Sequence, residues 1–354
     1  FHPNKSTIVA FGTGLSIILL STAMILFKGS QIETVLHIFL RDFLMIFVVG
    51  FCFPLLYVCA KEEHPYAALG ITKHRLKTSL ILNMFFAILL LLSFLSGNRE
   101  VIIINYKSLF AISYILVAGI FEMICIYGFM RYYFERAFGI IPAILLTALF
   151  YSLHHAGFQP EFLKLFFVGI MYCSVFYITR NIFIIFPFFW GVGAIWDVLI
   201  NSPAGQSLQN ATSFIVAIVL LVAMTIFIMK EKIMEAKMKS KNSFNKQAEK
   251  YDTSDYSKYP RECYPFVLNA INNIHFNKVL DLGCGTGVIL KEISSINSDV
   301  ELFGLDLSEN MITKATQRLG TTATLSVGDA ENLPYADNTF DLVCCVESFH
   351  HYPN

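Results

Sequence analysis

The chain has 354 residues, of which 55% are hydrophobic and only 15% charged, and it contains 34 phenylalanines. This composition excludes an ordinary soluble protein of that length and indicates a membrane protein. The formal net charge of zero averages two unlike halves, and it gives no reason to expect a nucleic acid partner.

Apolar stretches fill the first two thirds of the chain. A bilayer core of about 30 Å needs roughly 20 apolar residues per helix, and eight stretches come near that length. They lie at 7–27, 38–60, 78–96, 108–130, 139–155, 161–179, 182–200 and 211–229. Alternate loops retain more Lys and Arg, which places the even-numbered helix ends, and everything after residue 229, in the cytoplasm. The sequence therefore predicts an α-helical polytopic bundle of about eight spanning helices over 1–229, located in the cell membrane.

Ionisable residues within these stretches are candidates for function, because an isolated charge in hydrocarbon costs several kcal/mol. Four stand out, namely Glu122, His154, His155 and Asp197. Arg41 and Asp42 are adjacent in the second stretch and are expected to compensate each other.

The surroundings of Glu122 resemble a motif of the CAAX-protease and bacteriocin-processing family of intramembrane endopeptidases, whose three motifs read E-E-x-x-x-R, F-x-x-x-H and H-x-x-x-N/D. The stretch 122–128 has the leading Glu and a trailing Gly of the first motif. Met123 stands in place of its second Glu, and Tyr127 in place of its Arg. The first motif is thus only partly present.

The other two family motifs fall on the remaining candidates. Residues 150–154, Phe to His, match the second motif, and 151–155 keep its spacing with Tyr in place of Phe. In the third motif Asp197 matches, but Gly193 stands where histidine belongs. Since 156–274 contains no histidine, the missing group has no nearby substitute in the sequence.

The resemblance implies that Glu122 deprotonates a water while His154 or His155 stabilises an oxyanion. Two alternatives stay open. Glu122, a histidine and Asp197 are also compatible with a buried hydrogen-bonded cluster that only fixes helix packing. The other alternative is a binding or immunity-like module, which keeps the cavity but has lost the proteolytic activity.

A basic segment at 230–250 follows the last apolar stretch. It carries seven lysines, Lys230, Lys232, Lys237, Lys239, Lys241, Lys246 and Lys250. Such a juxtamembrane cluster can sit against anionic headgroups, but a solvated linker is the simpler interpretation.

Beyond residue 250 short β-rich runs alternate with amphipathic helices, which predicts a parallel α/β sheet. Strands are expected near 278–282, 301–305, 323–327 and 340–346, and helices at 259–274, 287–295 and 308–319. The pattern gives half of a doubly wound domain. The chain starts at Phe1 and stops soon after the last predicted strand, so we expect a fragment at both ends.

A hydrophobic strand at 279–282 leads into Gly283-Cys284-Gly285-Thr286-Gly287, a glycine-rich turn that opens a helix. Glycines let the backbone approach a ligand closely and present amides at the helix N-terminus. A dinucleotide fingerprint would read G-x-G-x-x-G, but here the spacing is G-x-G-x-G and Val288 occupies the last glycine position. The turn therefore favours S-adenosylmethionine over NAD.

At this point residues 244–354 resemble the class I S-adenosylmethionine-dependent methyltransferases, with a Rossmann-like fold. Asp306 ends the second strand, at the position where the family has an acidic residue that accepts both ribose hydroxyls. Leu307 follows it and is expected to line the same site. Residues 328–335, with Asp329 and Ala330, look like the adenine-side motif, with Asp329 facing the exocyclic amine. Residues 340–343 and 348–351 match the fourth strand and the turn after it.

Several of these residues keep a second interpretation. Asp306 is also suited to cap the following helix. Asp281 either orients the turn or meets the amino group of S-adenosylmethionine. Tyr251 covers the cofactor or is a core tyrosine, and Cys284 is expected to be a small filler in the turn.

His350 and His351 follow the fourth strand. They are candidates for a general base or an acceptor ligand, although loop histidines usually are neither. Eight cysteines without Cys-x-x-Cys or Cys/His spacing support neither a disulfide framework nor a zinc site,.

The leading hypothesis is a membrane-tethered methyltransferase that acts on a small-molecule, lipid or lipidated-peptide acceptor. Proteolysis within the bilayer and a non-catalytic membrane scaffold are the alternatives. Since S-adenosylmethionine brings its own leaving group, methyl transfer asks mainly for positioning, and the acceptor cannot be named.

Overall fold

The computed structural model describes residues 2–29, 32–97, 105–155, 161–201, 208–349 and 352. The chain divides into two compact units, unit 1 over Phe1–Phe227 and unit 2 over Ile228–Asn354. Each unit is described by itself.

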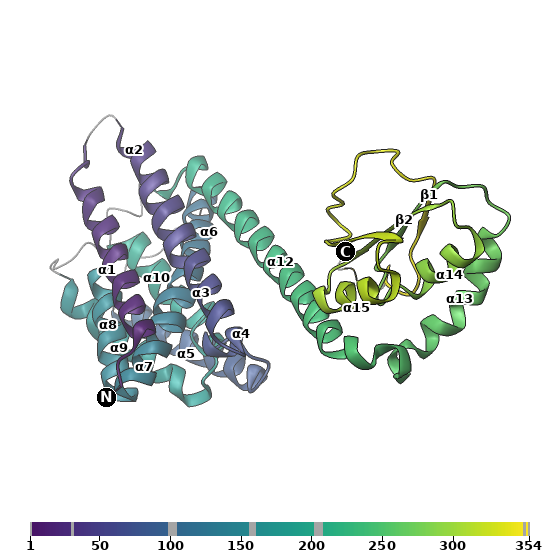
Figure 1. Cartoon of the computed structure of the whole chain (residues 1–354). Coiled ribbons are helices and arrows are strands. Elements are labelled where there is room, and N and C mark those ends of the chain that lie inside the picture. The colour runs from purple at the N-terminus through teal and green to yellow at the C-terminus, as the bar shows by residue number, and fades with distance from the viewer. Residues whose placement is uncertain are drawn as a thin grey trace. The chain divides into compact units, whose positions relative to one another are not determined.

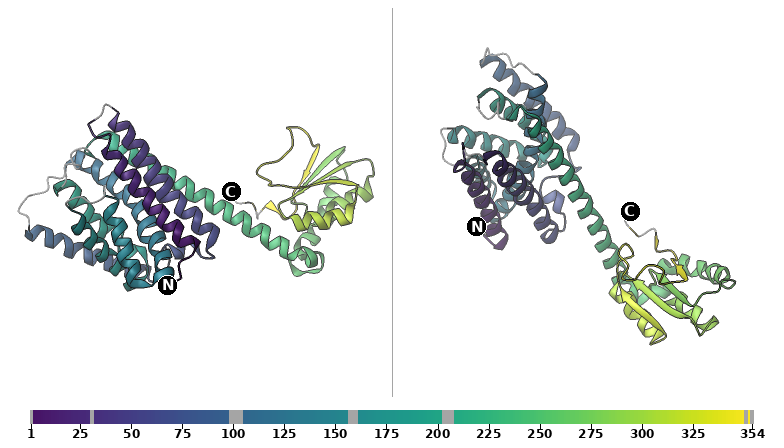
Figure 2. Two further views of the ribbon diagram at one scale, coloured as in Figure 1. Left: turned by 60° about the vertical axis from the view of Figure 1, so that its left-hand side comes forward. Right: turned by 90° about the horizontal axis from the view of Figure 1, so that it is seen from above.

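Unit 1 is a bundle of helices (Figures 1 and 2). Its elements are α1 (Lys5–Ile25), α2 (Glu33–Leu36), η1 (His37–Cys52), α3 (Phe53–Lys61), α4 (Pro65–Ala68), α5 (Leu76–Gly97), α6 (Tyr106–Phe121), η2 (Glu122–Met130), α7 (Arg131–Phe138), α8 (Ile140–Leu153), α9 (Phe162–Thr179), η3 (Ile182–Ile184), α10 (Phe188–Trp196), η4 (Asp197–Asn201) and the first part of α12 (Ala211–Gln247). Consecutive elements such as α6, η2 and α7 form one continuous helix in which a segment of wider π turns is inserted.

Six helices among the described residues are long and apolar enough to cross a membrane. They are Lys5–Ile25, Glu33–Lys61, Leu76–Gly97, Tyr106–Phe138, Phe162–Thr179 and Ala211–Thr253. The predicted count of eight spans is not confirmed, because the stretches predicted at 139–155 and 182–200 form the shorter apolar helices Ile140–Leu153 and Phe188–Ile200.

The local backbone explains these two short helices. Gly139 has a φ of +86° and separates α7 from α8. The end of α9 is set by Arg180, whose φ of +55° is left-handed. The side-chain amide of Asn181 then donates to the carbonyls of Thr72 and His74, at 2.8 and 3.0 Å, which pins the chain before α10 begins.

Helix α5 shows how unit 1 distributes its apolar side chains. Its buried residues are the small or polar Ser79, Asn83 and Ala87, whereas Ile81 and Leu92 are 69% and 57% exposed. A soluble monomer rarely exposes a continuous apolar surface of this kind. The outward face of α5 is therefore suited to lipid.

Unit 2 contains a four-stranded parallel sheet in the order β3-β2-β1-β4. The strands are β1 (Lys278–Leu282), β2 (Glu301–Asp306), β3 (Ala323–Val327) and β4 (Leu342–Cys344). This confirms the predicted parallel α/β sheet. All four strands point the same way, so the carboxyl ends of β1, β2 and β3 meet at one edge, where ligands bind in open α/β sheets.

Three helices flank this sheet (Figure 1). They are α13 (Lys258–Ile271), α14 (Val288–Ile296) and α15 (Glu309–Leu319), and α13 follows two short 3-10 segments, η5 (Ala248–Thr253) and η6 (Asp255–Ser257). The core between helices and sheet is apolar and includes Val279, Leu290, Ile293, Leu302 and Leu319. At the opposite edge from the ligand-binding side, the Asp341 carboxylate accepts the backbone N–H groups of Asn277 and Lys278 at 2.9 and 3.0 Å.

Candidate functional site

The glycine turn, residues 283–287, leaves β1 and opens α14. Gly283, Gly285 and Gly287 have φ values of +74°, +52° and +75°, which side-chain-bearing residues rarely adopt,. A Cβ on Gly283 would lie 2.4 Å from Ser348 Cβ, whereas a Cβ on Gly285 would meet no described residue within 4 Å. Gly285 thus presents bare backbone to open space, as a cradle for a ligand requires.

Asp306 faces this turn from the end of β2. Its Oδ2 accepts the N–H of Gly285 at 2.9 Å, and its Oδ1 accepts the N–H of Ser308 at 2.8 Å. Ser308, not Asp306, caps α15, since its hydroxyl accepts the N–H of Met311. Burial raises the pKa of Asp306, although the two N–H donors act in the opposite direction. The carboxylate is oriented towards the turn and retains acceptor lone pairs.

A pocket lies between the glycine turn and the ends of the strands. It is lined by Lys237, Ser240, Phe244, Tyr251, Pro260, Tyr264, Gly283, Cys284, Gly285, Leu305, Asp306, Leu307, Met311, Gly328, Asp329, Ala330, Glu331, Val346, Glu347, Ser348 and Tyr352. Eight of the ten residues predicted to bind the cofactor are in this lining. Gly287 instead lies at the start of α14, and Asp281 is buried beneath the turn.

Asp281 is 3% exposed and is not among the lining residues. Burial and the neighbouring Asp306 carboxylate raise the pKa of Asp281 to about 7. Of its two interpretations, the placement favours a role beneath the turn over direct contact with a ligand.

A polar clamp that the sequence did not indicate holds the segment before α13 on the glycine turn. Thr286 donates its hydroxyl to Asp252 at 2.6 Å. Arg318 of α15 donates to the Thr286 hydroxyl at 2.8 Å and also pairs with Asp252. Neighbouring Tyr251 is thereby placed in the pocket wall, half-buried.

Hydroxyl groups line the pocket beside β4. Ser348 donates to the carbonyl of Leu282 at 2.8 Å and lies 2.9 Å from the hydroxyl of Tyr352. The two histidines proposed beside this turn, His350 and His351, lie outside the described residues.

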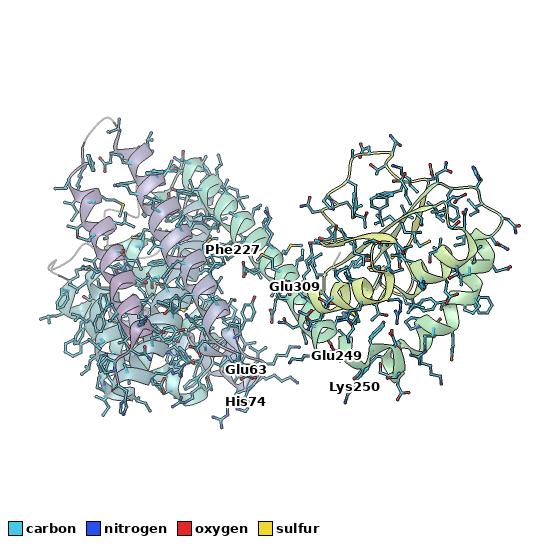
Figure 3. All side chains as sticks on the ribbon, in the orientation of Figure 1. Glu63, His74, Phe227, Glu249, Lys250 and Glu309 are labelled. Atoms are coloured by element: carbon cyan, nitrogen blue, oxygen red, sulfur yellow. The ribbon has the colours of Figure 1, made fainter. Side chains whose placement is uncertain are left out.

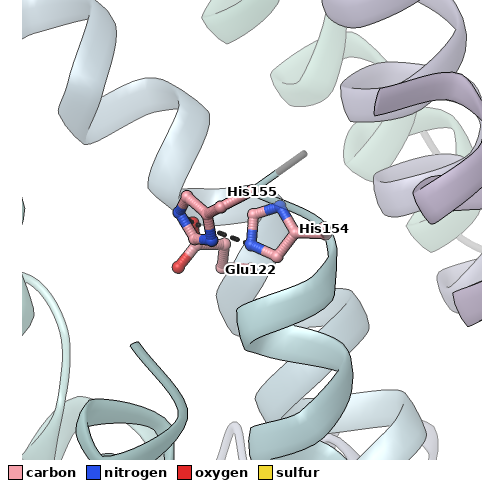
Figure 4. Close-up of side chains that lie close together, drawn as sticks. All are labelled: Glu122, His154 and His155. Atoms are coloured by element: carbon pink, nitrogen blue, oxygen red, sulfur yellow. Dashed lines mark ion pairs between the residues drawn. The ribbon is translucent and has the colours of Figure 1, made fainter. Parts of the chain in front are cut away.

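Unit 1 brings three of its four predicted residues together (Figure 4). Glu122 Oε1 lies 3.5 Å from His154 Nε2 and 3.9 Å from His155 Nε2. We call Glu122, His154 and His155 the polar trio. Glu122 begins the π-helical segment η2, and both histidines follow the end of α8, so the contact depends on the packing of α8 against η2.

The polar trio is closed in by neighbours that the motifs did not predict. Trp190 of α10 donates its indole N–H to Glu122 Oε2 at 2.9 Å. A Cβ on Gly193 would lie 2.5 Å from the Tyr172 hydroxyl, so Tyr172 occupies the space beside the position where the third motif has histidine. Asp197 is outside the trio and pairs with Lys164.

One ligand atom from each member of the trio lies within 4.8 Å of the others. Two imidazole nitrogens and a carboxylate oxygen are ligands that Zn²⁺ accepts, with a fourth position left for water. Among the described residues His154 Nε2 is buried without a hydrogen-bond partner, so it is available for such a role. The spacing of these residues in the sequence does not indicate a metal site.

Unit 2 therefore has the features of a Rossmann-like methyltransferase domain: parallel strands in the order β3-β2-β1-β4, a glycine turn after β1, and an acidic residue at the end of β2. Unit 1 has those of an apolar helical domain with a buried polar trio. Comparison with known families agrees with both. Residues 279–354 match the family described as "Methyltransferase domain". Residues 104–190 match "Type II CAAX prenyl endopeptidase Rce1-like", a range that includes the trio but not Gly193 or Asp197.

Relatives of known function match unit 2. The demethylmenaquinone methyltransferase of Symbiobacterium thermophilum is 31% identical over 28% of this chain and 43% of its own length. The 27-O-demethylrifamycin SV methyltransferase of Amycolatopsis mediterranei is 34% identical over 22% of this chain and 30% of its own length. The chain thus spans less than half the length of these relatives.

A solved structure, that of the plantazolicin methyltransferase BpumL in complex with a desmethyl plantazolicin analogue and SAH, is 26% identical over 32% of this chain and 48% of its own, with a TM-score of 0.25. The chain contains a segment that matches the Rce1-like family and a segment that matches a methyltransferase domain, and S-adenosylmethionine is the cofactor of the latter.

Proposed function

We propose that the chain is a methyltransferase tethered to the cytoplasmic face of the cell membrane, and that it acts on a small-molecule, lipid or membrane-associated acceptor. In this proposal 1–229 is a multi-pass membrane domain, 230–250 a basic cytoplasmic segment and 251–354 the catalytic domain. The apolar helices of unit 1 and the Lys and Arg bias of its loops support the orientation.

The observation that carries the proposal is the convergence of Asp306 and the glycine turn on one open pocket. Asp306 is held by the N–H groups of Gly285 and Ser308, and the Cβ-free face of Gly285 is unobstructed. The pocket has the residues that an adenosine needs. Asp306 offers a carboxylate to the ribose, the small Ala330 leaves room for the adenine ring, and Asp329 offers a carboxylate to the exocyclic amine.

S-Adenosylmethionine supplies an electrophilic methyl group and a neutral thioether leaving group, so the protein contributes mainly positioning. In the proposed mechanism Asp306 accepts the ribose hydroxyls and Asp329 the adenine amine. Tyr251, fixed by the clamp of Asp252, Thr286 and Arg318, covers the pocket and excludes water. His350 or His351 would take a proton from the acceptor.

A hydrophobic acceptor suits this arrangement. Five of the relatives carry the name demethylmenaquinone methyltransferase, and a domain anchored beside a bilayer meets membrane-dissolved acceptors at high local concentration. The Rce1-like segment makes a lipidated peptide a further member of this acceptor class.

The test is calorimetric binding of S-adenosylhomocysteine to the full chain in lipid nanodiscs. Asp306→Ala should weaken binding by about thirtyfold or more, since hydrogen bonds to charged groups contribute roughly 1.5–3 kcal/mol. Asp299→Ala, which removes an exposed carboxylate in the loop before β2, should leave binding unchanged. Failure of the wild-type chain to bind, or an Asp306→Ala variant that binds normally, would refute the proposal.

A second candidate function is endopeptidase activity within the bilayer. The observation in its favour is the polar trio, in which Glu122 can act on a water held against His154 or His155. Gly193 and the altered first motif count against it. Cleavage of a prenylated or leader-bearing peptide should be abolished by Glu122→Ala, and cleavage that persists in this variant would exclude Glu122 as the base.

The remaining alternative is a scaffold in which neither unit is catalytic. It predicts that the wild-type chain binds no S-adenosylhomocysteine and cleaves no peptide, whereas the leading proposal requires that the wild-type chain binds S-adenosylhomocysteine.

A further inference from the structure

The last turns of α12 form one wall of the unit 2 pocket. Lys237, Ser240 and Phe244 project from this helix into the lining. Although Lys237 belongs to a basic segment suited to solvent or headgroups, its side chain is only 19% exposed. It points to the acidic rim of the pocket rather than away from the domain.

Lys237 bonds to two carboxylates of the adenine-side motif. Its Nζ donates to Asp329 Oδ2 and to Glu331 Oε2, both at 2.6 Å. The other oxygen of Asp329, Oδ1, accepts the N–H of Glu331 at 3.0 Å. Both oxygens of the carboxylate assigned to the adenine amine are therefore engaged by groups of the protein.

The helix that carries Lys237 is fastened to the N-terminus of α15, directly after Asp306. Asn245 Oδ1 accepts the hydroxyl of Ser308 at 2.7 Å and the N–H of Asn310 at 3.1 Å. One turn earlier, Lys241 pairs with Glu309 at 2.6 Å, and Glu309 is labelled in Figure 3. The position of Lys237 is thus set by several contacts within unit 2.

We propose that Lys237 is a latch on the cofactor site, which competes with the adenine amine for Asp329. The inference rests on the proposed function, because it assumes that adenine binds at Asp329. The ammonium of Lys237 carries a charge opposite to that of Asp329, whereas the adenine amine is neutral, so Lys237 is the stronger of the two donors to this carboxylate. Adenine must therefore share Asp329 with Lys237, and the Lys237 pair weakens the bond that the amine gains.

The latch makes cofactor affinity depend on the juxtamembrane helix. Whatever draws Lys237 from Asp329 frees the acceptor and strengthens binding, and whatever holds Lys237 in place weakens it. By linkage, the bound cofactor must in turn weaken the hold of Asp329 on Lys237.

The test compares S-adenosylhomocysteine affinity among variants of the full chain in nanodiscs of neutral lipid. Lys237→Ala should tighten binding by about three- to tenfold, in keeping with the roughly 1 kcal/mol of a partly exposed ion pair. Lys237→Arg keeps the charge and should stay near the wild type. Lys239→Ala removes the same charge from an exposed position on the same helix and should change nothing.

Raising the salt concentration should reduce the difference in affinity between the wild type and Lys237→Ala. Since salt screens a partly exposed ion pair, the wild-type affinity should rise towards that of Lys237→Ala. Unchanged or weaker binding by Lys237→Ala would overturn the latch while leaving the proposed function intact, because the wild type would still bind. Absence of binding by every chain, the wild type included, would refute the proposed function and the latch with it.

Discussion

Each unit of the chain buries a carboxylate at its candidate site, but the two carboxylates have opposite surroundings. Glu122 of unit 1 receives an indole N–H from Trp190 and lies against two histidines. Asp281 of unit 2 has another carboxylate, Asp306, as its electrostatic neighbour. The polar trio is closed in by aromatic side chains, whereas the glycine turn of unit 2 opens onto a pocket.

The difference shows that convergence of polar residues and completeness of a motif are separate properties. In unit 1 the three polar residues of the trio come together, although the family motifs are altered at Met123, Tyr127 and Gly193. Unit 2 has both an intact glycine turn and an open face at Gly285. A ligand site requires this open face, and so we assign function to unit 2 first.

The largest expected effect concerns Asp281. Its pKa is raised to about 7 in the fold and is about 3.9 when unfolded. The unfolded state therefore gives up this proton at lower pH, so the stability contributed by protonated Asp281 is complete below about pH 4 and is lost as pH rises to about 7. Asp281→Asn should stabilise unit 2 at pH 8 by up to about 4 kcal/mol, at 1.36 kcal/mol per pKa unit.

Pulse proteolysis of the full chain in urea, read on fragments of 228–354, measures this effect. The gain should vanish at pH 4, where wild-type Asp281 is protonated. A gain of the same size at pH 4 and pH 8 would contradict the assignment of a buried, proton-binding carboxyl.

The second effect concerns the open face of the turn. Gly285→Ala should weaken S-adenosylhomocysteine binding by about thirtyfold, because the methyl group enters the ligand space and a left-handed alanine costs about 1 kcal/mol. Gly320 also has a positive φ, +58°, and open surroundings, but it lies outside the pocket lining. Gly320→Ala should therefore cost stability and spare affinity, and equal losses of affinity in both variants would argue for strain alone.

The third effect tests the closed site of unit 1. Trp190→Phe removes the indole N–H that donates to Glu122. It should lower the free energy of unfolding by roughly 1–3 kcal/mol more than a Trp→Phe substitution at another buried position, which removes the same volume. Trp196→Phe provides the match, since Trp196 is equally buried, at 3% exposure, and stacks on Phe94. Thermal melts of both variants in detergent decide the matter, and equal destabilisation would mean that the bond to Glu122 contributes nothing.

The smallest effect concerns the clamp on the turn. Thr286→Val removes the hydroxyl shared by Asp252 and Arg318, and loss of one such hydrogen bond costs about 1 kcal/mol. S-Adenosylhomocysteine affinity should fall by about fivefold through weaker positioning of Tyr251. An unchanged affinity would show that Tyr251 is placed without the clamp.

Much of unit 2 could be predicted from the sequence because its signals are local. The β-rich runs near 278–282 and 323–327 coincide with β1 and β3, and the glycine spacing and Asp306 lie within one βαβ segment. The Lys237 contact to Asp329 spans 92 positions and depends on how α12 packs on unit 2. Neither interpretation of the basic segment, headgroup binding or solvated linker, anticipated it.

Unit 1 was harder to predict because hydropathy is insensitive to helix ends inside apolar sequence. Gly139 separates α8 from α7 and Arg180 ends α9 ahead of α10, and the apolar pattern does not reveal the positive φ values of these two residues. The family motifs identified the polar trio, but Trp190 gave no signal as a donor, since tryptophan is also an ordinary apolar residue of a bundle.

The most direct measurement is an experimental structure of the full chain with S-adenosylhomocysteine. Our account predicts the ribose hydroxyls on the carboxylate of Asp306, the adenine beside Ala330 with its amine on Asp329, and the ammonium of Lys237 withdrawn from that carboxylate. A ligand bound elsewhere in the chain, or a pocket left empty at saturating ligand, would contradict it.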